Sequence, residues 1–327
     1  MSDFQPVRIA LLGAGHLGKI HLKCLLAQPQ FFEVVGFHDA HAATAERVQA
    51  ETGLPHFADV DELLASCEAV DIVTPTTNHH ASALRAIAAG KHIFLEKPLA
   101  ASLAEAEEIC AAAALKGITA QVGHVERFNP ALLSVQEILP LQQLQPRFME
   151  IHRLANFSPR GTDVSVVEDL MIHDLDILLH LVRSDVERVD ATGVSLMSAL
   201  PDIVNARVTF ASGAVANITA SRISMKPMRK FRLFSPDTYV SMDFLQKNAE
   251  LIRLHEQESE LTQTAIDTAK GRRYLQFAHC ESAPVNAIEM ELRRFAEAIR
   301  QKGTVPVPLT DGLQALRLAH LILERIV

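Results

Sequence analysis

The feature that most restricts the fold is a glycine-rich turn directly after an apolar strand. Residues 7–12 (VRIALL) read as a buried strand, the motif GAGHLG follows at 13–18, and a helical pattern continues to about residue 27. In this strand–turn–helix context, G-x-G-x-x-G is typical of dinucleotide binding. Gly13 permits the tight turn, Gly15 lets a pyrophosphate approach the backbone, and Gly18 lets helix and strand pack closely. The N–H groups of the helix N-terminus then face the phosphates.

The next strand, 33–38, ends at an acidic residue that indicates which dinucleotide is bound. Asp39 lies about 20 residues beyond Gly18, where an acid hydrogen-bonds the adenine ribose. A carboxylate there would repel a 2′-phosphate, and neither of the next two residues, Ala40 and His41, is arginine. We therefore predict NAD rather than NADP; the alternative is a solvated loop aspartate.

Helices and strands then alternate up to about residue 122. The pattern predicts helices at 41–52, 59–66, 79–89 and 101–116 and strands at 70–73, 91–95 and 119–122. Repeated βα units of this length imply a parallel, doubly wound sheet. We therefore predict an NAD-binding domain over residues 1–122.

One of these strands ends in a candidate for proton chemistry. Residues 93–95 are apolar in succession, and Glu96-Lys97-Pro98 follows. Proline disfavours helical geometry in the residue before it, so Lys97 is expected in a turn or extended conformation. Ligands of open α/β sheets lie at the carboxyl ends of strands, which makes this ammonium a catalytic candidate. The alternative is a surface Glu–Lys pair before a turn.

A second candidate lies on a helix in the other half of the chain. Ser165 and Glu168 form a capping-box pattern, and the helix that they open is expected to run to about residue 181. Asp169, His173, Asp176 and His180 would share one helical stripe, in which Asp169 orients the imidazole of His173. The alternatives are a solvated polar face or a metal site. Because no third ligand converges, we predict no metal.

The remaining segments predict an α/β domain over residues 123–327. Strands are expected at 148–153, 190–196, 203–210, 215–222, 230–235, 239–244 and 250–255, a long loop at 257–283, and helices at 285–301 and 311–326. The net charge of −8 argues against general nucleic-acid binding. No apolar run is long enough for a membrane span, and the N-terminus lacks a signal-peptide pattern. The four scattered cysteines are expected as free thiols in a reducing cytoplasm.

Several of these motifs together resemble the Gfo/Idh/MocA oxidoreductases. The Glu96-Lys97-Pro98 tripeptide after a buried strand is the most specific mark, and GHVERFNP at 123–130, EDLMIHD at 168–174 and LTDGLQAL at 309–316 extend the resemblance over almost the whole chain. It implies a Rossmann domain followed by an α/β domain whose open, mostly antiparallel sheet pairs subunits into a homodimer or homotetramer. It also implies that Lys97, Asp169 and His173 are the catalytic residues.

The motifs and the resemblance together predict the binding residues. Those expected to contact NAD are Gly13, Gly15, His16, Leu17, Gly18, Asp39, Thr74, Thr76, His79, Glu96, Lys97 and Arg127. Those expected to contact the substrate are Lys97, Arg153, Arg160, Thr162, His173 and Arg222. The implied reaction removes hydride from an alcohol carbon and a proton from its hydroxyl. Either His173 or Lys97 fits the role of base, and the sequence leaves that choice open.

The finer pattern around 160–167 and 220–224 resembles family members that act on nucleotide sugars. This implies oxidation of UDP-N-acetylglucosamine at its 3-hydroxyl, in lipid A assembly. A diphosphate approaching a chain of this charge needs local cations, and seven basic residues are available: Arg153, Arg160, Arg222, Lys226, Arg229, Lys230 and Arg232. The alternative for these is a solvated strand face. Two other functions stay open, a dehydrogenase of free polyols such as inositol and a non-enzymatic dinucleotide-sensing regulator.

Overall fold

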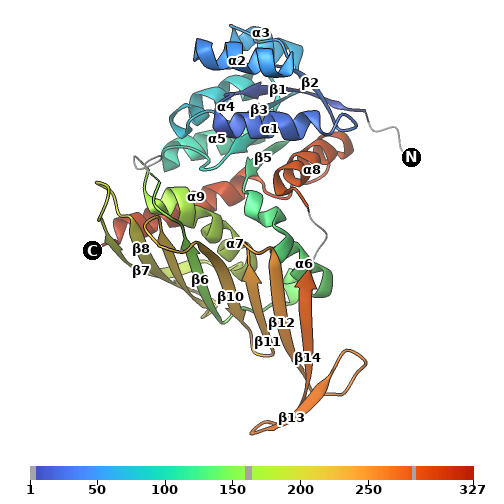
Figure 1. Ribbon diagram of the computed structural model, residues 1–327, viewed down its shortest axis with the longest axis vertical. Coiled ribbons are helices and arrows are strands. Elements are labelled where there is room, and N and C mark those ends of the chain that lie inside the picture. The colour runs from blue at the N-terminus through green and yellow to red at the C-terminus, as the bar shows by residue number, and fades with distance from the viewer. Residues whose placement is uncertain (1–4, 159–163, 282–284) are drawn as a thin grey trace. The chain divides into compact units, whose positions relative to one another are not determined.

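The computed structural model describes residues 5–158, 164–281 and 285–327, and the chain forms two compact units (Figure 1). Unit 1 comprises residues 1–125 and 286–316, and unit 2 comprises residues 126–285 and 317–327. Residues 286–316, which the sequence placed in the second domain, therefore belong to unit 1. The reason is helix α8 (Ala287–Gln301), whose Leu292, Phe295 and Ala296 pack into a core shared with β1 and β4.

Unit 1 is built on a five-stranded parallel sheet in the order β2-β1-β3-β4-β5. The strands are β1 (Val7–Leu12), β2 (Phe32–His38), β3 (Ala69–Ile72), β4 (His92–Glu96) and β5 (Ala120–Gly123). Single bridges extend it at both edges, Phe37 to His56 and Gln121 to Pro308. Nearly every residue of β1, β3 and β4 is buried, as expected for strands covered on both faces. The predicted doubly wound sheet is confirmed.

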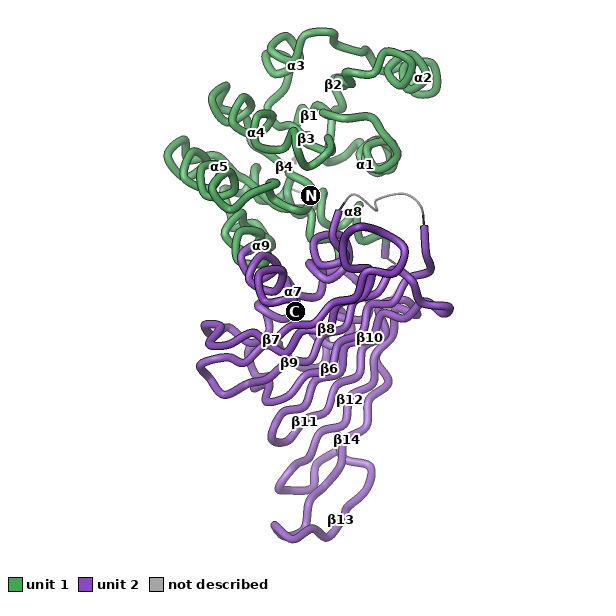
Figure 2. The backbone as a smooth tube through the Cα atoms, turned by 90° about the vertical axis from the view of Figure 1, so that its left-hand side faces the viewer, with its two compact units in different colours: residues 1–125, 286–316 green, residues 126–285, 317–327 purple. Residues whose placement is uncertain are grey.

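The helices of unit 1 cover both faces of this sheet. They are α1 (His16–Leu26), α2 (Ala42–Thr52), α3 (Val60–Ser66), α4 (His79–Ala88), α5 (Leu103–Lys116) and α8, with the 3-10 turn η1 (Thr76–Asn78) and the start of α9 (Leu309–Glu324). Helix α1 packs beside α8, and α4 packs beside α5. Figure 2 shows the strands between these two pairs.

Unit 2 contains a nine-stranded sheet in the order β13-β14-β12-β11-β10-β6-β9-β8-β7 (Figure 2). Its strands are β6 (Phe148–Leu154), β7 (Val186–Val194), β8 (Ile203–Phe210), β9 (Val215–Ser221), β10 (Met228–Phe234), β11 (Thr238–Asp243), β12 (Asn248–His255), β13 (Thr264–Thr268) and β14 (Gly271–Glu281). Strands β6 and β9 pair in parallel, and every other strand pair in this sheet is antiparallel. The predicted mostly antiparallel sheet is confirmed.

One sequence prediction in this unit is wrong. Residues 257–283 were expected to be a long loop, whereas most of them form the hairpin β13–β14, and β14 pairs with β12 along eight residues. Gly271, with φ of 94°, lies at the hairpin turn, where a positive φ favours glycine. The hairpin lies at the sheet edge and is largely exposed, so its polar composition hides the strand pattern.

The sheet of unit 2 buries one face. In β8, Val204, Ala206 and Val208 are buried while Asn205 and Arg207 are exposed, which is the alternation of a sheet covered on one side. Helices α6 (Pro130–Ile138) and α7 (Ile172–Val182) contribute to the core on the buried side. The short turns η2 (Val125–Phe128), η3 (Leu141–Gln143) and η4 (Val167–Met171) complete the elements. Among the described residues, no helix is both long and apolar enough to cross a membrane.

Candidate active site

A pocket of about 730 Å³ lies at the carboxyl ends of the strands of unit 1. The strand order changes direction between β1 and β3, and ligands of open α/β sheets bind at such a switch point. Most of the predicted cofactor residues line this pocket, namely Gly13, Gly15, His16, Leu17, Asp39, Thr74, His79, Glu96 and Lys97. Thr76 is not among the lining residues and lies at the start of η1. Gly18 lies below the pocket in α1.

The three glycines of the first turn have three different environments. Gly13 has φ of 90°, a backbone conformation that is strained for any residue with a side chain. A Cβ on Gly18 would lie 1.9 Å from the carbonyl oxygen of Gly13, so the packing of helix on turn requires glycine there. A Cβ on Gly15 would meet no protein atom within 4 Å and would project into open space. This is the cradle that a dinucleotide pyrophosphate fills, so the residues present fit NAD.

The acid predicted to bind the ribose is held in place by the same turn. Asp39 Oδ2 accepts a hydrogen bond from the backbone N–H of Ala14 at 2.8 Å, and Oδ1 accepts one from the backbone N–H of His41 at 2.8 Å. Each oxygen keeps acceptor capacity for a ribose hydroxyl. The geometry therefore fits a diol and disfavours a phosphate at the 2′ position.

Lys97 lies in the turn after β4, and two side chains contact this turn, Glu96 at the end of β4 and His79 on α4. The backbone N–H of Lys97 donates to Glu96 Oε2 at 3.1 Å. The imidazole of His79, on α4, lies with Nδ1 2.8 Å from the carbonyl oxygen of Pro98 and Nε2 2.9 Å from that of Thr74. Burial lowers the pKa of His79. His79, predicted to bind cofactor, thus lines the pocket and also links the ends of β3 and β4.

In unit 2, the segment with the predicted catalytic pair is not a uniform α-helix. Val167–Met171 forms a π-helical turn (η4), and α7 begins at Ile172. Such turns are frequent at functional sites. Ser165 Oγ accepts from the N–H groups of Val167 and Glu168 at 3.1 and 3.3 Å, so the serine half of the predicted capping box is present, whereas Val166 is the residue that directly precedes the π turn and Glu168 lies 3.7 Å from His320. Asp169 lies in the π turn and His173 in the first turn of α7, both half-buried; their mutual hydrogen bond stays a prediction.

Two arginines predicted to contact ligands are engaged by carboxylates of α7. Arg127 donates through Nε and Nη2 to Asp176. Arg153 donates through Nε and Nη2 to Asp174 at 2.7 and 2.9 Å, and through Nη1 to Glu126 at 2.9 Å. Arg127, Arg153 and both aspartates are buried. In unit 2 these bidentate pairs fix α7 against η2 and β6, a structural contribution that the sequence reading missed.

Among the described residues, the predicted basic set is divided rather than gathered in one cluster. Arg222 is buried and donates to the carbonyl oxygen of Val164 at 2.6 Å, whereas Arg160 and Thr162 lie outside the described residues. Strand alternation sets Lys230 and Arg232 on the face opposite Arg229, where they pair with Asp243 and Glu150. The period of two along β10 was visible in the sequence and would have divided this set.

The sequence reading also missed a buried polar cluster beneath the pocket. His21 on α1 and Asp71 on β3 are fully buried and hydrogen-bonded to each other. Asp71 interrupts the apolar run 70–73, and a carboxylate inside a buried strand was the available signal. The distant Glu291, on α8, carried no such signal because only the tertiary fold brings it to the same place.

A parallel doubly wound sheet, a glycine turn open toward the pocket and a ribose-binding acid define a dinucleotide-binding oxidoreductase. Family models agree: residues 7–124 match the Gfo/Idh/MocA model described as an oxidoreductase family with an NAD-binding Rossmann fold, and residues 146–235 match the Gfo/Idh/MocA C-terminal domain. The chain belongs to the Gfo/Idh/MocA family, and it is an NAD-dependent dehydrogenase.

Individual relatives extend this comparison. The chain is 38% identical to the UDP-N-acetylglucosamine 3-dehydrogenase of Acidithiobacillus ferrooxidans over 75% of this chain and 76% of that protein. It is 28% identical to the scyllo-inositol 2-dehydrogenase of Bacillus subtilis over 94% of this chain and 90% of that protein. A solved structure of the Acidithiobacillus enzyme superposes with a TM-score of 0.88 at 32% identity, covering 98% of both chains.

Proposed function

We propose that this protein oxidises the 3-hydroxyl of UDP-N-acetylglucosamine to the 3-keto sugar with NAD. The observation that carries this proposal is the similarity to the Acidithiobacillus enzyme of that name, both in sequence and along 98% of the chain in structure. The proposal includes a place in lipid A assembly in the cytoplasm, which the resemblance implies, and there the ketone is consumed by a PLP-dependent aminotransferase.

In this proposal the catalytic residues are Lys97, Asp169 and His173. NAD, when bound, supplies the hydride acceptor. A half-buried ammonium at the end of β4 stabilises negative charge as the hydroxyl loses its proton. A neutral imidazole at His173 accepts that proton, and Asp169 orients the ring. The reverse assignment, with Lys97 as base, stays open.

The test is NADH formation, followed by absorbance, with purified protein and three alcohols. UDP-N-acetylglucosamine is compared with free N-acetylglucosamine and with inositol, with and without a PLP aminotransferase plus glutamate to remove the ketone. Of the three alcohols, we expect only the nucleotide sugar to give NADH, and we expect the aminotransferase to increase the amount formed. NADH from free sugar or inositol but not from the nucleotide sugar would contradict the proposal.

The catalytic assignment has its own test in single substitutions. Lys97→Ala and His173→Ala are each expected to reduce kcat at least 100-fold, since removing a positioned acid or base typically loses about 10²–10⁴-fold. NAD affinity should change much less, because most residues that line the pocket remain. NADH formation that survives both substitutions in one chain would refute the assignment.

A second candidate is oxidation of a free polyol. It is favoured by the inositol dehydrogenases among the relatives, of which the Bacillus subtilis enzyme matches along 94% of this chain. Such a substrate has no diphosphate to neutralise. Reversal of charge at Arg160 should then leave KM unchanged, whereas a nucleotide-sugar enzyme should show a higher KM.

A further inference from the structure

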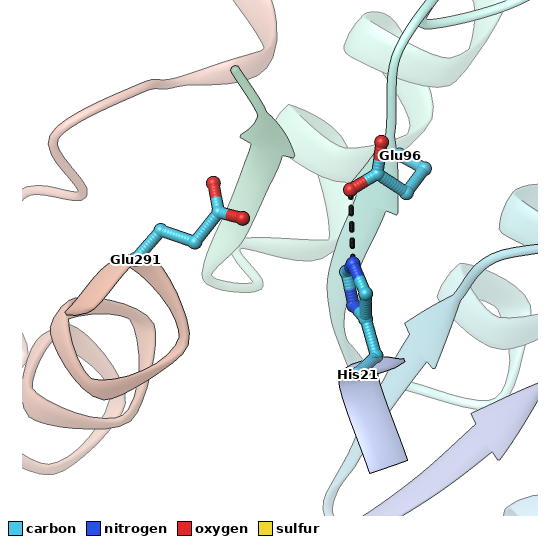
Figure 3. A group of neighbouring side chains, drawn as sticks. All are labelled: His21, Glu96 and Glu291. Carbon is cyan, nitrogen blue, oxygen red and sulfur yellow. Dashed lines mark ion pairs between the residues drawn. The ribbon is translucent and has the colours of Figure 1, made fainter. Parts of the chain in front are cut away.

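Beneath the lysine turn, unit 1 contains a cluster of ionisable side chains from four elements. The ring of His21, on α1, has Nδ1 2.9 Å from Asp71 Oδ2 and Nε2 3.2 Å from Glu96 Oε1. Figure 3 shows the His21–Glu96 pair, with the carboxyl group of Glu291 directed toward it from α8. His21, Asp71 and Glu291 are completely buried, and Glu96 is 7% exposed.

The carboxylate of Glu96 connects the cluster to Lys97. Glu96 uses one oxygen for His21 and the other for the backbone N–H of Lys97. The chain leaves room for this carboxylate, because a Cβ on Gly123 would lie 2.5 Å from Glu96 Oε1. The position of Glu96 is therefore set by the ion pair with His21, by the N–H of Lys97 and by the absence of a side chain at Gly123.

The charges of the cluster follow from its burial. For His21, burial opposes the charged form, but the two carboxylates at its nitrogens raise its pKa well above the ordinary value. For Glu96, burial also opposes charge, yet the hydrogen bond and charge of His21, with the charge of Lys97, lower its pKa. Burial and then the charge of Glu96 raise the pKa of Glu291 well above its ordinary range. These directions favour a protonated His21, an ionised Glu96 and an uncharged Glu291, while burial raises the pKa of Asp71 against the opposing charge of His21.

The same atoms have a second possible use, as ligands of a divalent cation. Ligand atoms of His21, Glu96 and Glu291 all lie within 4.8 Å of one another. A ligating ring must keep a lone pair on Nε2, whereas carboxylates at both nitrogens favour the doubly protonated ring. The arrangement therefore favours protons over an ion, and the test below includes the ion as a contrary outcome.

We propose that His21 is a positioning residue for Lys97: its ring holds the Glu96 carboxylate, and Glu96 fixes the turn that carries the lysine. The proposal rests on the proposed function, in which Lys97 contacts the reacting hydroxyl. Without the imidazolium, a buried Glu96 becomes protonated more readily, and Lys97 loses both an anchor and a neighbouring negative charge.

The test compares His21→Gln with Asp71→Asn, which keeps the ring but removes one of the carboxylates that charge it. Titratable groups that interact with the ring are Asp71, Glu96, Glu291 and Cys24, and Lys97 acts on Glu96. For folded His21→Gln we expect NAD affinity within about 3-fold of wild type and kcat lower by at least about 10-fold. The acid limb of the kcat–pH profile should be displaced to higher pH by about one unit, because His21 no longer lowers the pKa of Glu96. Asp71→Asn should change kcat and the pH profile in the same direction as His21→Gln, but by a smaller amount.

The control is His92→Gln at the other end of β4, where the ring accepts from the N–H of Thr119 at 2.9 Å. It should lower stability without moving the pH profile. A folded His21→Gln with wild-type kcat and profile would overturn the proposal; if that variant does not fold, a wild-type profile in Asp71→Asn would do so.

Two further measurements separate the remaining explanations. One equivalent of tightly bound metal, whose removal by a chelator reproduces the loss of activity, would show that the cluster binds an ion and would also overturn the proposal. Lys97→Ala is measured in parallel. An inactive Lys97→Ala beside a fully active His21→Gln removes only the positioning role, whereas an active Lys97→Ala removes the catalytic lysine of the proposed function itself.

Discussion

At the scale of single residues, the glycine turn shows that one motif can contain constraints of different origin. Gly18 is required by the protein's own packing, because its Cβ would overlap the carbonyl oxygen of Gly13. Gly15 has open space instead, so any constraint there comes from the ligand. The motif alone does not separate the two, but the atomic environments do.

This difference predicts opposite effects of two alanine substitutions. Gly15→Ala should keep the stability of the wild type within about 0.5 kcal/mol and raise the Kd for NAD at least about 10-fold. Gly18→Ala should lower the free energy of unfolding by about 1–3 kcal/mol, as overpacking does. Denaturant unfolding measures the stability of each variant, and calorimetric titration measures its Kd for NAD. A Gly18→Ala of wild-type stability, or a Gly15→Ala of wild-type affinity, would contradict this interpretation.

A second residue-scale prediction concerns a buried carboxylate in the loop between β7 and β8. Asp202 is fully buried, and its oxygens accept from the N–H groups of Leu196, Met197 and Ser198 and from the hydroxyl of Ser198. Burial opposes its ionisation, but these hydrogen bonds lower its pKa from 3.8 to about 2. Because the folded-state pKa lies below the unfolded one, the stabilisation is complete above about pH 4 and lost as the pH falls through about 2.

Asp202→Asn should therefore lower the free energy of unfolding at pH 7 by about 2 kcal/mol, the range of a hydrogen-bonded charge. The difference from wild type should shrink as the pH approaches 2. Asp190→Asn, on the exposed part of β7, is the control and should change stability little. Equal stability of Asp202→Asn and wild type at pH 7 would refute the assigned role.

At the scale of elements, the segment with Asp169 and His173 depends on how its first turn is capped. Ser165 lies just before the π turn, and its Oγ accepts from two consecutive N–H groups. A π turn alters the angular relation of the residues on either side of it. The i, i+4 stripe inferred from uniform α-helical spacing is therefore replaced by two segments with different geometry.

Ser165→Ala should lower the free energy of unfolding by about 1 kcal/mol, as loss of an N-cap does, and should also reduce kcat because the turn holding Asp169 loosens. Ser102→Ala is the matched control, since Ser102 caps α5 in a complete capping box. It should reduce Tm similarly and leave kcat unchanged. Equal kcat in the two variants would show that the cap of the π turn matters only for stability.

At the scale of the whole molecule, the open face of the sheet in unit 2 is the candidate contact between subunits. Paired register places five apolar side chains in one row across five strands: Phe148, Phe234, Tyr239, Ile252 and Phe277. The rings of Phe148 and Phe234 lie 5.8 Å apart, and those of Phe234 and Tyr239 lie 5.0 Å apart. Phe277 is 47% exposed. A contiguous apolar row on an exposed face is typical of an interaction site.

The predicted homodimer or homotetramer can be tested on this row. Phe234→Glu places a charge at its centre and should convert the wild-type oligomer into monomers, measured by light scattering after gel filtration. Asn205→Glu lies on the same face but outside the row, and should keep the wild-type mass. A monomeric wild type, or an oligomeric Phe234→Glu, would contradict the predicted interface.

Local pattern was sufficient for a large part of this protein. The strand–turn–helix with its glycines, the acid at the end of β2, the lysine turn after β4 and the alternating strands all depend on residues close in sequence, where backbone sterics and side-chain period act directly. These established the parallel sheet, the mostly antiparallel sheet and the NAD pocket. The hairpin β13–β14 escaped this reasoning because an exposed edge hairpin lacks the apolar alternation that marks a strand.

Other features depended on the tertiary structure, because they join residues distant in the chain. Helix α8 belongs to unit 1 since its apolar face fills the core beside β1 and β4. Arg127 and Arg153 meet buried aspartates of α7, and His21, Asp71, Glu96 and Glu291 converge from four elements. The charge of each buried group depends on which neighbours the fold supplies. Sequence therefore determined which chemistry the chain carries near the pocket, and the tertiary structure decided which charges meet and which side chains hold the lysine turn.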